Sequence, residues 1–351
     1  MKELIEDRRY CASSYLMYRT IIDDNKTFSN KYSRNTHEIP ENRIKIHSSD
    51  ELHIALQTQV EKLVATGKKV ALCLSGGIDS GILARFLPKD TIAYTFKCVV
   101  PGQEVTDETP GAAKYAKECG LDHRIVEIYW EDFENYTPTL LKHKGMPFHS
   151  IEVQMYKAGL QAKKDGVDVL IYGESADLNY GGLSILLSQD WTVGQFVDRY
   201  AYVKPYAALK ESDLVLDPIH QCEQNGYIDV HKFNTHPFMK EALNSYYNAC
   251  ETANIEYFLP YSNTVLDVPL DLKRIRNGEN KYLIREIFTK LYPGFEIPPK
   301  TPMPRPMDEW FSDWQGPTRP EFWPHCTDPM SGDQRWLVWC LERYLNLLDE
   351  A

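Results

Sequence analysis

Residues 69–87, KVALCLSGGIDSGILARFL, join two patterns of different period. The first six residues form a short apolar run typical of a buried strand, and Ser75-Gly76-Gly77 ends it. The next ten residues have helical spacing up to Pro88, which cannot continue a helix. The stretch therefore predicts a strand, a tight glycine turn and a helix.

Further strands and helices are predicted on both sides of this unit. Strands are expected over 91–100, 124–128 and 167–172, and helices over 52–64, 109–119, 131–142 and 150–164. Strands that alternate with helices of this length indicate βαβ units, and hence an α/β fold with a parallel sheet and helices on both faces. In such sheets ligands bind beyond the carboxyl ends of the strands.

The composition predicts one large domain with an irregular start. Residues 1–50 are expected to form an irregular lead-in, because 20–50 are polar and turn-rich without a sustained period. Residues 51–351 are expected to form the domain itself. Its nucleotide-binding α/β core is placed at about 51–190, and a mainly helical, Pro- and Trp-rich remainder at 191–351.

Charge and hydropathy exclude several classes of partner. The 351 residues carry a formal net charge of -11, which gives no overall attraction to nucleic acid or to anionic lipid. The start of the chain lacks the apolar run of a signal peptide, and no segment is apolar enough for a membrane span. We expect a cytoplasmic protein without nucleic-acid or membrane partners. Its eight scattered cysteines are expected to be free, mostly buried thiols.

The glycine turn carries the clearest chemistry. Backbone amides, two hydroxyls and the start of a helix form a cradle for an anion, and glycines let a ligand approach the backbone closely. The residues of this cradle are Leu74, Ser75, Gly76, Gly77, Asp79 and Ser80. A carboxylate beside bare phosphate would repel it, so Asp79 indicates Mg²⁺ bound with ATP or pyrophosphate. The plain alternative is a turn followed by a capped helix.

The SGGIDS sequence in this setting resembles the PP-loop of the N-type ATP pyrophosphatases, a group that includes asparagine synthetase, NAD synthetase and tRNA-modifying enzymes. The resemblance implies the adenine nucleotide alpha hydrolase-like fold. A second stretch, residues 172–182 with sequence YGESADLNYGG, is similar to the asparagine synthetase element G-E-G-S-D-E-x-F-G-G. By that similarity Gly173 contacts the nucleotide, Asp177 is the second Mg²⁺ ligand with Asp79, and Glu174 lies beside the reacting carboxyl group.

Three further stretches extend the resemblance toward the C-terminus. Residues 298–310, PPKTPMPRPMDEW, are similar to the family's R-P-K-x-G-F-x-x-P-x-x-x-W, which places Lys300 at the catalytic lysine. An ammonium there neutralises charge on an adenylate as an amine attacks; the plain alternative is a solvated loop lysine. The stretches 280–285, NKYLIR, and 256–261, EYFLPY, resemble the family's K-x-x-L-R and E-x-R-x-P-F.

Departures from the family pattern concern the substrates. Glutamine-dependent asparagine synthetases have a nucleophilic cysteine directly after Met1, whereas this chain has Lys2. We therefore expect ammonia or an amine as nitrogen donor, with a separate glutaminase as the alternative source. Phe258 replaces the arginine of E-x-R-x-P-F, and Tyr261 and Asn263 lie near it on the substrate side of the family's site. This apolar replacement predicts a larger or less charged carboxylic acid than aspartate.

Together these features predict an AMP-forming ligase. It uses ATP and Mg²⁺ to adenylate a small-molecule carboxylate and transfers the acyl group to ammonia or an amine, giving an amide. Two alternatives stay open: a tRNA-modifying PP-loop enzyme, which the acidic net charge disfavours, and a non-catalytic ATP-binding subunit.

Overall fold

The computed structural model describes residues 4–299, 301 and 303–350. Within these residues the main sheet has five strands in the order β10-β7-β4-β5-β6, and every pairing in it is parallel. The strands are β4 (Val70–Cys73), β5 (Ile92–Cys98), β6 (Asp122–Ile128), β7 (Val169–Ile171) and β10 (Glu256–Phe258). The predicted α/β class with a parallel sheet is confirmed.

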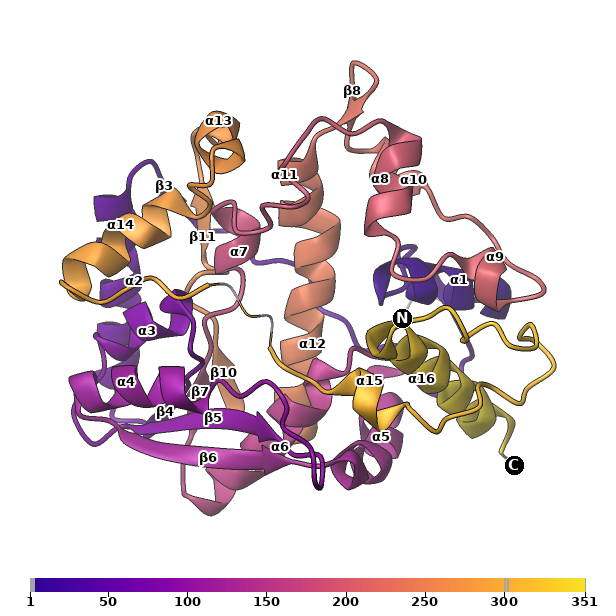
Figure 1. Cartoon of the computed structure of the whole chain (residues 1–351), viewed down its shortest axis with the longest axis horizontal. Helices are drawn as coiled ribbons and strands as arrows, with labels where there is room; N and C mark the ends of the chain where they lie inside the picture. Colours follow the sequence, from indigo (N-terminus) through magenta and orange to yellow (C-terminus); the bar gives the residue numbers. More distant parts are fainter. Residues whose placement is uncertain (1–3, 300, 302, 351) are drawn as a thin grey trace.

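Both faces of the sheet are covered by helices, because its strands are apolar on both sides. In β4, Val70 and Leu72 point into one apolar cluster, and Ala71 and Cys73 into the other. The first cluster is formed with α2 (Ser49–Val64), α3 (Ile78–Ala84), α4 (Thr109–Cys119) and α14 (Tyr282–Leu291). The second is formed with α5 (Trp130–Lys144), α6 (Ile151–Lys164) and α12 (Met239–Thr252), the long helix at the centre of Figure 1.

The start of the chain is more ordered than the sequence predicted. Residues 8–18 form helix α1 (Arg8–Tyr18), which begins where the Asp7 side chain accepts a hydrogen bond from the Tyr10 amide. Its last eight residues are buried, and it lies near the C-terminal helix α16 (Gly332–Asp349) in Figure 1. The expectation of an irregular lead-in is therefore wrong for this segment, whose apolar side chains complete the second cluster.

Residues 20–50 contain little regular structure, as expected: β2 (Lys26–Thr27) pairs with β1 (Ile5–Glu6), and β3 (Ile44–Ile46) pairs with β11 (Thr264–Leu266). Beyond residue 190 the chain is mainly helical. Its other elements are α8 (Val193–Tyr200), α9 (Pro205–Ala208), α10 (Asp217–His220), β8 (Glu223–Gln224), β9 (Tyr227–Ile228), α11 (Val230–Phe233), the π-helix η1 (Asn234–Phe238), α13 (Leu272–Arg276) and α15 (Met307–Trp310).

Strand β10 also comes from this later part and forms one edge of the main sheet, so the sheet extends beyond the expected 51–190 core.

The structure also describes the cysteines and the hydrophobic character of the helices. All eight cysteines are free, and all but Cys119 are buried. In the described part of the chain, no helix combines the length and the apolar character needed to cross a bilayer.

Candidate active site

The PP-loop connects β4 to α3 and is held by its own hydroxyl groups. The Ser75 amide donates to the Ser80 hydroxyl oxygen over 3.0 Å, and the Gly77 amide donates to the Ser75 hydroxyl oxygen over 3.1 Å. The turn after β7 packs directly against this loop, since a Cβ on Gly173 would lie 3.1 Å from the Ser80 amide nitrogen. The two turns therefore meet at the carboxyl edge of the sheet, where the topology predicts a ligand.

One ammonium joins the two predicted metal-binding carboxylates. The Lys281 Nζ lies 2.5 Å from Asp79 Oδ2 and 2.7 Å from Asp177 Oδ1. Burial alone would lower the pKa of Lys281, but the carboxylates of Asp177 and Asp79 outweigh it and hold that pKa above its ordinary value. Asp79 follows β4, Asp177 lies in the short helix α7 (Ala176–Asn179) after β7, and Lys281 precedes α14.

Space around this contact is limited by a glycine. A Cβ on Gly182 would lie 1.8 Å from Asp177 Oδ1 and 2.3 Å from Lys281 Cε. No side chain larger than hydrogen fits there without displacing the ion pair. Gly182 of the second motif therefore makes room for the charged groups.

Glu174 lies in surroundings that raise the pKa of its carboxyl group. Burial raises its pKa most, and the negative charges of Asp177 and Glu241 raise it further, while hydrogen bonds from the Ser175 amide and the Tyr246 hydroxyl act in the opposite direction. The net direction is upward. A raised pKa makes a carboxylate a stronger base, which suits a group that accepts and returns protons during a reaction.

These residues line one cavity of about 560 Å³. Its first part consists of the PP-loop, Asp177, Lys281 and the turn before α4. Its second part is lined by rings and by basic side chains: Phe96, Tyr202, Phe238, Tyr246, Arg19, His149 and Arg305. The cavity is thus lined by the PP-loop and also by aromatic and cationic groups, and Glu174 lines it as well. We call the part at the PP-loop the phosphate end and the part at the cationic groups the cationic end.

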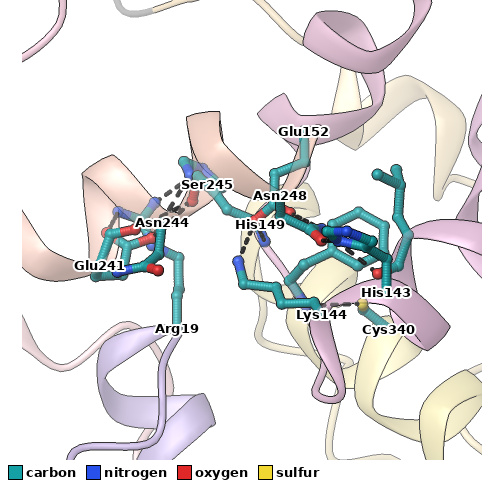
Figure 2. A network of polar contacts seen from close by, with 12 residues as sticks. Arg19, His143, Lys144, His149, Glu152, Glu241, Asn244, Ser245, Asn248 and Cys340 are labelled. Atoms are coloured by element: carbon teal, nitrogen blue, oxygen red, sulfur yellow. Dashed lines mark hydrogen bonds and ion pairs between the residues drawn. The ribbon is translucent and has the colours of Figure 1, made fainter. Parts of the chain in front are cut away.

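The cationic end is held by a buried polar network that Figure 2 shows from close by. The Arg19 guanidinium contacts Glu241 at 2.9 Å and His149 Nε2 at 2.8 Å. The backbone amide of His149 donates a hydrogen bond to Glu152 Oε1 over 3.1 Å. Glu152 in turn forms a fully buried ion pair with Lys144. The network links α1, α5, α6 and α12, so the position of His149 is fixed by core packing.

Comparison with known proteins identifies the family of this chain. The asparagine synthase family matches residues 51–257, more than half of the chain. The chain belongs to the asparagine synthase family. A putative glutamine-hydrolyzing asparagine synthetase of Methanocaldococcus jannaschii is 29% identical over 133 residues, covering 36% of this chain and 24% of that protein. The glutamine-hydrolyzing asparagine synthetase of Bos taurus is 24% identical over 257 residues, covering 68% of this chain and 39% of that protein.

The chain therefore aligns with well under half the length of these two relatives. Among solved structures, an NMN synthetase from Francisella tularensis is 13% identical with a TM-score of 0.29, over 73% of this chain and all of that one. An NH3-dependent NAD synthetase from Campylobacter jejuni is 15% identical with a TM-score of 0.26, over 38% of this chain and 61% of that one. Scores of this size do not establish a shared architecture, and the fold stands on the sheet topology itself.

The structure brings most of the family's predicted residues together. Leu74 to Gly77, Asp79, Ser80, Gly173, Glu174 and Asp177 all line the cavity. Lys300 lies outside the described residues, so its predicted catalytic role stays a prediction. Pro299 and Thr301, on either side of it in the chain, line the same cavity.

The three residues expected on the substrate side lie elsewhere. None of Phe258, Tyr261 and Asn263 is among the described residues that line the cavity. Phe258 pairs in register with Ile171 and packs into the first apolar cluster. Tyr261 is fully buried and its hydroxyl donates to the Asp79 carbonyl oxygen over 3.0 Å, and the Asn263 side chain donates to Gln59. The expectation that these three residues lie on the substrate side of the site is therefore wrong. Tyr261 instead supports the site through its hydrogen bond to Asp79.

The cationic end of the cavity was not predicted from the sequence. Arg19 and His149 belong to no family motif, and Arg19 lies in the segment expected to be irregular. Arg305 lies in the third motif, 298–310, but at a position that the pattern leaves unspecified. The sequence does contain a signal for Lys281 as a site residue, because the family's K-x-x-L-R pattern begins at this lysine. For Arg19 the only clue was the apolar content of residues 11–18, which indicates a buried helix that ends beside the core.

Proposed function

We propose that this protein is an ATP-dependent, AMP-forming ligase that activates a carboxylate and transfers it to ammonia or an amine. The observation that carries the proposal is the convergence of the PP-loop, Asp79, Asp177 and Glu174 on one cavity in a chain of the asparagine synthase family. Phosphate cradles and carboxyl groups placed together in this way suit adenylation followed by acyl transfer.

The donor set fits a divalent cation. Asp79 and Asp177 come from two strand ends, and one ammonium contacts both carboxylates, so the two groups converge on a single point. Carboxylate oxygens are the ligands that Mg²⁺ prefers. Asp79 and Asp177 would hold the ion, and when bound it would neutralise charge on the phosphates of ATP.

The chain's own residues supply the remaining parts of the reaction. In the first step a carboxylate oxygen bonds to the α-phosphorus of ATP and the bond to pyrophosphate breaks, while the PP-loop amides and hydroxyls bind the departing anion. In the second step the nitrogen lone pair attacks the acyl carbon and AMP leaves. Glu174 is placed to take the proton that the nitrogen loses, since it lines the same cavity.

The nitrogen donor is proposed to be ammonia or a small amine, with a separate glutaminase as one source of ammonia. The cytoplasm is the proposed location. The nitrogen donor can be tested with the purified protein.

Product analysis tests the reaction class. The purified chain is incubated with Mg²⁺, α-labelled ATP, ammonium and a panel of carboxylic acids, and nucleotides are separated by chromatography. Acid-dependent formation of AMP and pyrophosphate is expected. Acid-dependent release of ADP and phosphate by the wild-type protein would contradict the proposal.

A further inference from the structure

The ammonium of Lys281 lies at the point where the two predicted metal ligands converge. Its Nζ is 2.5 Å from Asp79 Oδ2 and 2.7 Å from Asp177 Oδ1. The Lys281 side chain is only 9% exposed, so solvent screens this contact little. Mg²⁺ binds carboxylate oxygens at about 2.1 Å, which is closer than the ammonium approaches them. The ammonium and the divalent cation therefore compete for the same two oxygen atoms.

The backbone around this contact fits the lysine closely. A Cβ on Gly182 would lie 2.3 Å from Lys281 Cε, so that glycine bounds the space beside the side chain. Lys281 itself has φ 53° and ψ 35°, the left-handed conformation that costs free energy in a residue other than glycine. A residue keeps such a conformation only where the surrounding structure determines it. The lysine is therefore built into this position, and the ion pair is a designed part of the site.

The protein supplies few ligands of its own to a metal ion. Residues 4–299, 301 and 303–350 contain no group of three or more His, Cys, Asp or Glu side chains that could hold one. Where a protein gives Mg²⁺ one or two carboxylates, water and substrate phosphates complete its octahedral coordination. ATP would bring these phosphates into the cavity that Lys281 and the PP-loop both line. The same phosphates offer a displaced ammonium a new anionic partner.

We propose that Lys281 and the divalent cation exclude each other at the carboxylates of Asp79 and Asp177, so that the cation binds there tightly only together with ATP. The proposal rests on the metal site of the proposed ligase function and adds the order in which ion and nucleotide bind. Without nucleotide the ammonium holds the carboxylates, and the apparent Kd of a free ion rises in inverse proportion to the fraction of molecules in which they are released. With nucleotide, the phosphates draw the ammonium away.

Binding of Mn²⁺ to the full chain tests this order. Mn²⁺ stands in for Mg²⁺, because free Mn²⁺ gives an electron paramagnetic resonance signal that is lost on binding. Without nucleotide, Lys281→Met should bind Mn²⁺ with a Kd at least about tenfold below that of wild type, as expected when the ammonium holds about nine-tenths of the sites. Equal Kd values would overturn the inference. Lys290→Met is the matched control, since Lys290 lies in α14 and pairs with Asp50 at the surface.

A double variant locates the gained affinity. Addition of Asp79→Asn to Lys281→Met should remove the tighter binding of Mn²⁺, because one of the two carboxylates is lost. Circular dichroism of each variant checks that the chain is folded. A gain that persists in the double variant would arise outside this pair of carboxylates and would overturn the inference.

A measurement on the wild-type chain covers the case in which Lys281→Met does not fold. Acetic anhydride modifies accessible amines, and mass spectrometry reports each lysine separately. Mn²⁺ at a concentration that saturates the chain, without nucleotide, should raise acetylation of Lys281 several-fold, because an amine released from its ion pair is freer to react. Acetylation of Lys290 should stay the same. Unchanged acetylation of Lys281 would overturn the inference.

These outcomes are separate from that of the ligase test. Binding of Mn²⁺ is measured without ATP or acid, so equal affinities of wild type and Lys281→Met would leave the formation of AMP unaffected. Failure of the chain to form AMP would count against the ligase function and would leave the difference in Mn²⁺ affinity in place.

Discussion

The two ends of the cavity are lined by different kinds of chemical group. The phosphate end consists of backbone amides, short hydroxyl side chains and two carboxylates, all on turns that follow parallel strands. The cationic end is lined by Arg19 directly after α1, by His149 before α6 and by Arg305, and a buried ion network holds Arg19 and His149. The first end is built mainly from short loop groups, whereas the second depends on long side chains that only tertiary packing brings together.

Loss of a carboxylate at the phosphate end should have the largest effect. Asp79→Asn is expected to lower kcat at least about 100-fold, as is typical when one preorganised electrostatic group is removed. The KM of the acid should hardly change, because the residues that line the rest of the cavity are intact. Steady-state AMP formation measures both constants, with Asp267→Asn, an exposed acid paired with Lys45, as control. A large rise in the acid KM would show that the two ends do not act separately.

The second prediction concerns Glu174, at the boundary between the two ends of the cavity. Glu174→Gln should slow amide formation roughly 100-fold through loss of a general base, while pyrophosphate exchange stays within a few-fold of wild type. Since the pKa of Glu174 is raised, the wild-type rate should fall as pH is lowered through that pKa, and the variant should lack this acid limb. Equal loss in both half-reactions would place Glu174 at the phosphate end instead.

Lys281→Met tests how the phosphate end holds itself together. Removal of the ammonium leaves two carboxylates facing each other, which should lower the free energy of unfolding by about 2 kcal/mol. Urea unfolding monitored by circular dichroism measures the change, and millimolar Mg²⁺ should restore part of it. Lys290→Met, which breaks an exposed pair with Asp50, should change stability by about 0.5 kcal/mol or less. Similar values for the two variants would contradict the role given to Lys281.

The smallest expected effect concerns Glu108, beside the PP-loop. Burial and the charge of Asp107 raise its pKa to about 7, although a hydrogen bond from the Gly76 amide works against this. Above that pH the carboxylate carries a charge and competes with phosphate for the same amide. The KM of ATP should therefore rise a few-fold between about pH 6 and 8, and Glu108→Gln should flatten the profile. Glu104→Gln, at an exposed position, serves as control; a profile that Glu108→Gln does not alter would contradict this.

The sequence predicted the phosphate end well because its determinants are local. A strand, a glycine turn and a helix occupy consecutive residues around Ser75 and Asp79, and a second local motif after another strand carries Asp177. Arg19 and Arg305 reach the same cavity only through tertiary packing of segments far apart in the chain. Phe258 was placed wrongly because the face of a short edge strand depends on its register with β7, which no pattern in residues 256–261 specifies.

The contact of Lys281 with Asp79 and Asp177 also bears on whether folding requires a metal ion. It joins three segments that lie far apart in the chain, so protein groups themselves hold this part of the site together. Structural zinc modules, by contrast, unfold when the metal is removed. We therefore expect a chelator to stop turnover while the far-ultraviolet circular dichroism and the thermal midpoint stay as they were.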